Sequence, residues 1–340
     1  MQISLFPDTC ASDHDAESSR VEKPVLGATI DEEISALAKS LPPSLRMGTS
    51  SWYFPGWAAQ VWAKQYPEVT LSRYGLPAYA QHPLLRCVSI DRTYYRPLDA
   101  AQFALYAAQV PDDFRFVVKA PALIADALIR DGAGRGLRPN PTFLHPDTAL
   151  RHFVTPALEG LGHKLGALVF QLSPLPLDGL SQLPRLIVQL RRLLDMLAEV
   201  RARIPGGVVA VEVRDREWLR DEFVTALRST GATYCLGLHP RMPSIDEQLP
   251  ILRELWPAPL VCRWNLNAKH GAFGYEEARD LYAPFDKLVD EDPATCASLA
   301  RLIAGSLRGG QPAYVIVNNK AEGSAPLSIR KLAKAVQVLA

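Results

Sequence analysis

The sequence predicts a single TIM-type (β/α)8 barrel with a partly ordered N-terminal extension, and three observations predict it. From residue 45 onward, short β-branched runs alternate with stretches of helical periodicity. Most of these runs are continuously apolar, which is typical of parallel strands buried on both faces. Eight such runs occur, the number that closes a parallel barrel. The predicted limits are 1–44 for the extension and 45–340 for the barrel, and an open doubly wound sheet is the alternative.

The predicted elements follow one another in regular βα alternation. The predicted strands are Arg46–Ser50, Arg86–Ile90, Arg115–Lys119, Ala167–Leu172, Val208–Val213, Thr233–Leu238, Leu260–Trp264 and Ala313–Val317. The predicted helices are Leu98–Val110, Leu180–Ile204, Glu217–Ser229, Glu276–Phe285, Pro293–Leu307 and Pro326–Leu339. Two connections, Leu123–Leu144 and Asn265–Tyr275, are longer than a barrel needs. Both follow strand carboxyl ends, so we expect them on the functional face, where long loops are often lids or binding loops.

The N-terminal extension differs from the rest of the chain in being polar, acidic and poor in periodicity. Within it, Asp31–Leu41 has the apolar spacing of a short helix, with Asp31 as its cap. Pro42 and Pro43 end this helix, because proline cannot continue it. We predict a mobile extension that packs against the barrel, and plain disorder is the alternative.

Composition narrows the class of protein. The chain has 340 residues, 48% of them hydrophobic, and a net charge of +1, so no global charge attracts nucleic acid or membranes. Its five cysteines are odd in number and none shows CxxC spacing, which argues against a disulfide framework and a zinc knuckle. We therefore expect a cytoplasmic protein without a signal peptide or membrane span, and the sequence leaves its oligomeric state open.

Polar residues stand where the predicted strands end, and they indicate a pocket at the carboxyl face of the barrel. Glu212 and Arg214 lie two residues apart, so their side chains point the same way. Lys119 and Arg263 each end an apolar strand, and a buried cation needs a partner. Either nearby carboxylates neutralise these cations, or an anionic ligand does.

Six segments carry a resemblance to a known family: Met47–Trp52, Ser89–Tyr95, Phe114–Lys119, Leu165–Pro174, Glu212–Trp218 and Asn318–Pro326. In this order they resemble the GTSGW, ExN[ST][ST]FY, FxFxxK, LGxxLxQLPP, ExRxxxW and NNxxxGxAP motifs of the domain of unknown function 72, or YecE-like, family. The resemblance spans about residues 46–335. It implies a single TIM-type barrel and no settled activity.

This chain departs from the family pattern at positions that bear on chemistry. Ser89 stands where the family has glutamate, and Asp91 stands where it has asparagine. After Arg263, Trp264 and Asn265 replace the family's x-His-Gly. We therefore expect Asp91 to supply the second acid of the pocket.

The predicted catalytic residues are Glu212 or Asp91 as base, together with Lys119, while Arg214 and Arg263 stabilise negative charge. Two acids and three cations leave a pocket net positive, which favours phosphate or carboxylate ligands. The alternatives are a structural ion pair of Glu212 with Arg214, or a charge network that satisfies itself.

The loop after the eighth strand is a recurrent phosphate-binding place in TIM barrels, because it leads into a helix N-terminus. Ordinary helix capping explains the same pattern, with Ser324 as the cap. The ligand-binding residues predicted there are Asn318, Asn319, Lys320, Gly323 and Ser324.

Trp52, Tyr94 and Gln171 complete the predicted ligand-binding set, the aromatic rings as stacking surfaces. His239 is the histidine that directly follows a strand, and no HExxH or His-x-His spacing occurs, so no metal site is predicted. No nucleophile elbow, Walker loop or dinucleotide fingerprint is present, so no cofactor is predicted.

Two functions are consistent with these observations. The first is an enzyme, a hydrolase or phosphate-ester-processing enzyme, that acts on an anionic small molecule or nucleotide; a metal-dependent nuclease is a weaker variant. The second is a non-catalytic protein that binds an anion, or nucleic acid through the arginines of residues 130–138.

Overall fold

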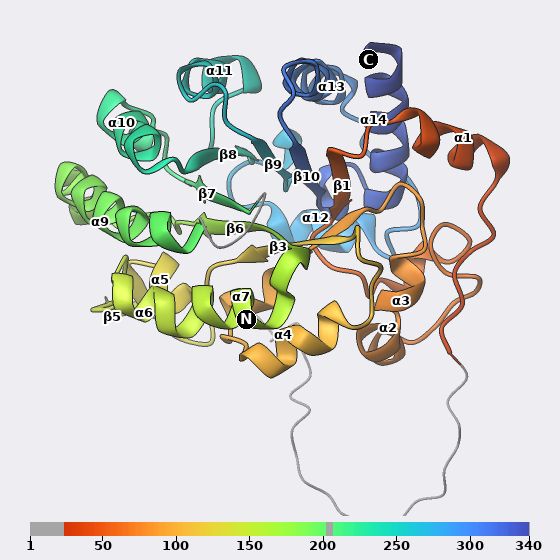
Figure 1. The fold of residues 1–340 in the computed structure, drawn as a ribbon, viewed down its shortest axis with the longest axis horizontal. Helices are drawn as coiled ribbons and strands as arrows, with labels where there is room; N and C mark the ends of the chain where they lie inside the picture. The colour runs from red at the N-terminus through yellow and green to blue at the C-terminus, as the bar shows by residue number, and fades with distance from the viewer. Residues whose placement is uncertain (1–23, 202–206, 340) are drawn as a thin grey trace, which may run out of the picture.

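The computed structural model describes residues 24–201 and 207–339, and its centre is a closed ring of parallel strands (Figure 1). Around the ring the strands follow the order β1-β10-β9-β8-β7-β6-β3-β2. The first strand pairs with the last, which confirms the predicted TIM-type barrel and excludes the open sheet. The strands are β1 Leu45–Thr49, β2 Cys87–Ile90, β3 Arg115–Lys119, β6 Leu165–Gln171, β7 Val208–Glu212, β8 Thr233–Leu238, β9 Leu260–Trp264 and β10 Ala313–Val317.

Helices surround this ring on its outer face (Figure 1). They are α1 Glu32–Ser40, α2 Glu68–Tyr74, α3 Leu76–Tyr79, α4 Ala100–Ala107, α5 Ala122–Ala125, α6 Pro146–Ala149, α7 Thr155–Leu161, α8 Leu177–Ser181, α9 Leu183–Arg201, α10 Asp221–Thr230, α11 Ile245–Glu254, α12 Tyr275–Tyr282, α13 Pro293–Arg308 and α14 Ala325–Leu339. Within residues 24–201 and 207–339, no helix combines the length and apolar character that a bilayer span requires.

All eight predicted barrel strands are present, and their ends differ from the predicted ones by at most two residues. The helices that follow most of them are also present, although the predicted end of the longest, Ile204, lies outside the described residues. The predicted long loop at Leu123–Leu144 contains a short antiparallel hairpin of β4 Leu128–Arg130 and β5 Gly136–Pro139. Helix α11 was not predicted; Pro250 lies inside it, and proline normally interrupts a helix.

The polar residues form one layer inside the barrel, at the carboxyl ends of the strands. Successive side chains of a strand point to opposite faces, so every second residue points into the ring. The buried interior cluster includes Cys87, Val117, Val169, Ala210, Val261 and Ile316. The residues two positions further along the chain therefore also point inward. They are Ser89, Lys119, Gln171, Glu212, Arg263 and Asn318. The predicted site is therefore the polar continuation of the interior face, at the carboxyl ends of the strands.

The described part of the N-terminal extension packs against the barrel. Helix α1 begins after Asp31, whose Oδ1 accepts the Ile34 amide at 2.6 Å, as the sequence predicts. It lies beside α14, although the two helices are far apart in the sequence (Figure 1). Glu33 bonds Arg330 and Lys334 of α14, both at 2.5 Å. These exposed pairs each contribute little, while the buried Leu37 anchors the helix.

Helix α4 gives a simple test of local stability. It starts with a capping box, in which the Asp99 side chain accepts the Gln102 amide at 2.8 Å and the Gln102 side chain accepts the Asp99 amide. Asp99→Ala removes this cap and is expected to lower the free energy of unfolding by about 1 kcal/mol, as measured by urea denaturation. Asp99→Asn is the control, because asparagine caps nearly as well, and an equal loss in both variants would contradict the capping role.

Candidate functional site

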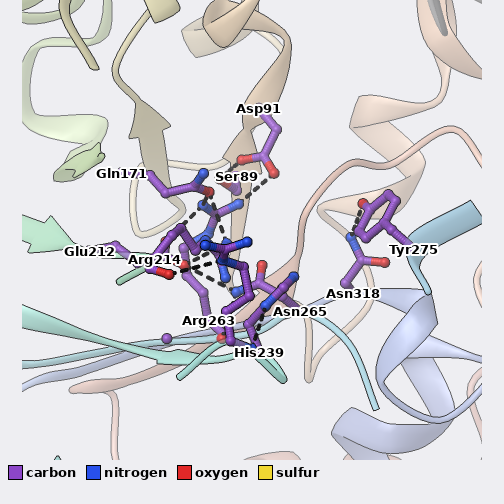
Figure 2. A network of polar contacts seen from close by, with 12 residues as sticks. Ser89, Asp91, Gln171, Glu212, Arg214, His239, Arg263, Asn265, Tyr275 and Asn318 are labelled. Carbon is purple, nitrogen blue, oxygen red and sulfur yellow. Dashed lines mark hydrogen bonds and ion pairs between the residues drawn. The ribbon is translucent and has the colours of Figure 1, made fainter. Parts of the chain in front are cut away.

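A network of ion pairs centred on Arg263 fills the middle of the barrel mouth (Figure 2). Its Nη2 donates to Asp91 Oδ2 at 2.5 Å, and its Nη1 donates to Glu212 Oε2 at 3.0 Å and Gln171 Oε1 at 2.8 Å. The guanidinium thereby joins Asp91, which directly follows β2, to residues of β6 and β7 across the ring. Its side chain is only 2% exposed, so these bonds replace the hydration of Nη1 and Nη2, while Nε has no hydrogen-bond partner within the described residues.

Glu212 lies between two guanidinium groups and is fully buried. Arg214 Nη2 donates to its Oε1 at 2.7 Å, opposite the bond from Arg263, and Asn265 Nδ2 donates at 3.2 Å. Gly237 on the neighbouring strand leaves the space for this carboxylate, because a Cβ there would stand 3.1 Å from Oε1. Two charged donors make Glu212 the anchor of the network.

Asp91 and Ser89 form the accessible edge of the network. Ser89 Oγ donates to Asp91 Oδ1 at 2.6 Å, and the Asp91 side chain is 27% exposed, unlike that of Glu212. Ser89 thus supports the Asp91 carboxylate by a direct hydrogen bond. A small cavity of about 30 Å³ adjoins Asp91 and reaches Ser50 and Trp52. It has room for one or two waters.

Lys119 lies beside this network without joining it. Its ammonium lies 3.9 Å from the centre of the Tyr94 ring, and within the described residues it forms no ion pair or hydrogen bond. Burial lowers the pKa of Lys119 to about 7; Asp91 raises it in part, while Arg263 and Arg214 lower it further. The amine therefore changes charge near neutral pH.

Tyr94 and Trp52, the two aromatic residues predicted to bind a ligand, differ in their contacts with the charged residues of the mouth. The Tyr94 hydroxyl donates to Asp126 at 3.0 Å and contacts Ser173 Oγ at 2.7 Å, so its ring is held under Lys119. Trp52 is only 3% exposed and packs edge-on against Tyr106. Tyr94 thus contacts a charged residue of the site, and Trp52 belongs mainly to the core.

The loop after β10 is buried, with Asn318 only 9% and Lys320 only 7% exposed. Asn318 Nδ2 donates to Ser50 Oγ at 3.0 Å and to the Tyr275 hydroxyl at 3.3 Å, apart from the arginine network (Figure 2). The Lys320 ammonium lies 4.2 Å from the centre of the Tyr275 ring. Within the described chain this ammonium forms no ion pair. Both residues therefore contact Tyr275, the first residue of α12.

The remaining three residues of this loop are not brought to the mouth. Asn319 Oδ1 accepts the Trp57 indole N–H at 3.1 Å and the Ala325 amide at 2.8 Å, so Asn319 itself caps α14. Ser324 is fully buried and its hydroxyl bonds Gln60 at 2.9 Å. Gly323 is buried, and a Cβ there would stand 2.5 Å from the Lys287 carbonyl oxygen. The expected open phosphate site at this helix N-terminus is thus covered by protein.

His239 and Asn265 also lie beside the arginine network, and neither was among the predicted site residues (Figure 2). Asn265 follows β9 by one residue, so its position beyond the strand end was the available signal. His239 follows β8, and its Nδ1 accepts the Arg241 amide at 3.1 Å. Burial, with Arg214 and Arg241 nearby, lowers the pKa of His239 to about 3. The imidazole is therefore neutral at physiological pH and presents Nε2–H as a donor.

The lowered pKa of His239 is expected to make the fold less stable in acid. The unfolded histidine gains a proton below about pH 6.5, whereas the folded one does so only near pH 3. The unfolded state therefore binds more protons in this window, and stability is lost as pH falls through it. His239→Gln, which can still accept the Arg241 amide, is expected to lose less stability between pH 6.5 and 4 in urea titrations. Identical pH profiles for both proteins would contradict this.

Within residues 24–201 and 207–339, no three histidine, cysteine, aspartate or glutamate residues form a group suited to a metal ion. Cys87, Cys235, Cys262 and Cys296 are free thiols buried in the core. The side chains described at the mouth are therefore carboxylates, guanidiniums, amides, the His239 imidazole and the amines of Lys119 and Lys320.

Comparisons with known proteins agree with this architecture. A family model described as "Protein of unknown function DUF72" matches residues 46–339. A DUF72 family protein from Enterococcus faecalis is 18% identical, with a TM-score of 0.52, covering 86% of this chain and 95% of that one. Another from Thermotoga maritima is 20% identical, with a TM-score of 0.52, covering 85% and 98%. No curated protein matches the chain. The chain therefore belongs to the DUF72 family of proteins of unknown function.

Proposed function

We propose that this protein is an enzyme that binds a small anionic molecule at the barrel mouth and uses Lys119 for proton transfer. The observation that carries the proposal is the position of Lys119. Its amine ends an apolar strand, lies against an aromatic ring, and has no acid partner within the described residues. Such a group needs a negative partner when charged, and the ligand supplies it.

The charge balance of the mouth supports an anionic ligand. In the central network, Asp91 and Glu212 match Arg214 and Arg263, so the four charges cancel. Lys119 therefore adds a net positive charge beside this network whenever it is protonated. The alternative that the sequence left open, a charge network that satisfies itself, thus holds for Asp91, Glu212, Arg214 and Arg263. Lys119 is the fifth charged residue, and it is left to pair with the ligand.

Two further groups are suited to orienting an anion. Arg214 Nη1 is buried and has no hydrogen-bond partner within the described residues. His239 is neutral and retains a donor at Nε2. Donors that are fixed before the ligand arrives stabilise negative charge without reorganisation, which is the arrangement that favours catalysis.

Proton transfer is better assigned to Lys119 than to Glu212. Glu212 is fully buried and accepts hydrogen bonds from two guanidiniums and an amide. An amine whose pKa lies at about 7 can both give and take a proton at neutral pH. Asp91 is the carboxylate within reach of a ligand, because 27% of its side chain is exposed. A phosphate ester or a carboxylate is the substrate class that this arrangement fits best.

The test compares the parent with Lys119→Gln and Lys64→Gln. Lys64 is a matched control, because its ammonium also lies over a tyrosine ring, at 5.4 Å, but outside the network. Inorganic phosphate, sugar phosphates and nucleotides are titrated by calorimetry, and turnover is followed by phosphorus NMR. Binding and turnover by the parent and by Lys64→Gln, but not by Lys119→Gln, support the proposal. Equal binding by all three proteins, or no binding by any, refutes it.

A rival function is nucleic-acid binding without catalysis, favoured by aromatic residues at the rim. Phe273 is 89% exposed and Tyr95 is 60% exposed, and exposed rings can stack on unpaired bases. The basic loop contributes less than its sequence suggests, because Arg130 pairs with Asp126 and Arg135 pairs with Asp131. Binding of a fluorescent single strand that falls steeply with salt and with Phe273→Ala would favour this rival.

A further inference from the structure

A second cavity lies away from the mouth, on the outer wall of the barrel. It has a volume of about 500 Å³ and opens between α11 and α13, which stand side by side in Figure 1. Thr233 and Leu260, the first residues of β8 and β9, form its base. The cavity is therefore at the amino ends of two strands whose carboxyl ends reach the mouth. Its volume is within the range of small-molecule sites.

The walls of this cavity are mainly apolar. Leu249 and Leu252 come from α11, and Leu302 comes from α13. Trp256 closes one end and is 50% exposed; its ring packs where Gly309 leaves room, since a Cβ there would stand 2.2 Å from the ring. A surface this apolar and this open to water gains free energy when an apolar ligand covers it.

One buried polar group, the Ser306 hydroxyl, also lines the cavity. Ser306 is only 7% exposed, yet within the described residues its Oγ has no hydrogen-bond partner. A buried hydroxyl without a partner is unusual and costly, so a ligand atom that bonds it is favoured.

Two arginines give the rim a positive charge. Arg253 and Arg301 both line the cavity, and neither forms an ion pair within the part of the chain described. Arg301 Nη2 donates to Ser298 Oγ at 2.9 Å, which holds it near the opening. Asp246 is the acid among the lining residues, so two cations face one anion.

We propose that this cavity binds a small amphiphilic carboxylate, with its apolar chain between α11 and α13 and its carboxylate at the rim. The apolar walls fit the chain, and Arg253 and Arg301 fit the carboxylate, because guanidinium groups bind carboxylates with two parallel hydrogen bonds. Nothing in this proposal depends on the reaction at the barrel mouth.

Gly305 offers a direct way to fill the cavity. It lines the space from the last turn of α13, and a Cβ at this position would meet no atom within 4 Å. Gly305→Leu therefore places a side chain in the cavity without a clash at Cβ. Leucine also favours the helix over glycine, so the variant is expected to fold at least as stably as the parent.

Decanoate is the probe, with 1-decanol as its uncharged counterpart, and calorimetry measures binding to the full chain. The parent is expected to bind decanoate more tightly than decanol, and Gly305→Leu is expected to weaken binding at least tenfold. Gly132→Leu is the matched control, because Gly132 also has open space around its Cβ but lies outside the cavity. Arg301→Gln is expected to remove the preference for decanoate, whereas Arg308→Gln on the same helix leaves it intact.

Three results would overturn the proposal. The first is no binding of either probe to the parent. The second is equal weakening by Gly305→Leu and Gly132→Leu, which would place the binding elsewhere. The third is a parent dimer, detected by light scattering, that Gly305→Leu converts to a monomer, because a second copy of the chain would then occupy the groove.

Discussion

Glu212→Ala is expected to lower the free energy of unfolding by about 3–5 kcal/mol, measured by chemical denaturation at pH 7. The substitution removes the carboxylate between Arg214 and Arg263 and leaves two buried guanidiniums, exposed by only 9% and 2%, with fewer partners. An uncompensated buried charge is among the costliest changes that one substitution can make.

Asp91→Ala provides the comparison, because Asp91 also pairs with Arg263 but is 27% exposed. Water can replace part of this carboxylate, so the loss is expected to be about 1–2 kcal/mol. If both variants lost the same stability, burial would not be the cause, and the role assigned to Glu212 as anchor would be wrong.

Lys119→Met is expected to have the opposite effect and to stabilise the fold by about 2 kcal/mol at pH 6. The unfolded lysine stays charged up to about pH 10.5, whereas the folded one loses its proton near pH 7. Below pH 7 the folded state therefore carries a charge in an unfavourable place, and methionine removes that charge while keeping a similar length.

The sign of the pH dependence makes this prediction testable. Between about pH 7 and pH 10 the unfolded state binds the extra proton, so the parent gains stability as pH rises. The stability difference between Lys119→Met and the parent should therefore shrink over this range. A difference that stays constant with pH would show that Lys119 does not titrate as described. Stabilisation with loss of anion binding is the pattern expected of a functional residue.

The strands and their polar ends could be predicted because both follow from simple periodicities. Parallel strands buried on both faces appear as short apolar runs. Residues two positions apart share a direction, so Glu212 and Arg214 had to be neighbours, and they form a pair at 2.7 Å. Side chains alternate between inward and outward along each strand, and this alternation places Lys119 and Arg263 at the same mouth.

The partners of the other polar residues could not be predicted, because they depend on contacts distant in the sequence. Asn319 bonds Trp57, 262 positions earlier, and Ser324 bonds Gln60, 264 positions earlier. Because of these contacts, the loop that the sequence predicts as a phosphate site is buried against other segments of the chain. Helix α11 carries two opposing local signals: the capping box of Ser244 with Glu247 favours a helix start, and Pro250 argues against a helix.

The pairing of β1 with β10 has a consequence for biosynthesis. Leu45–Thr49 finds its partner only at Ala313–Val317, so the ring cannot close until nearly the whole chain has left the ribosome. Until then the edge of β1 lacks this neighbour, and the hydrogen-bonding groups it will use are open to other chains.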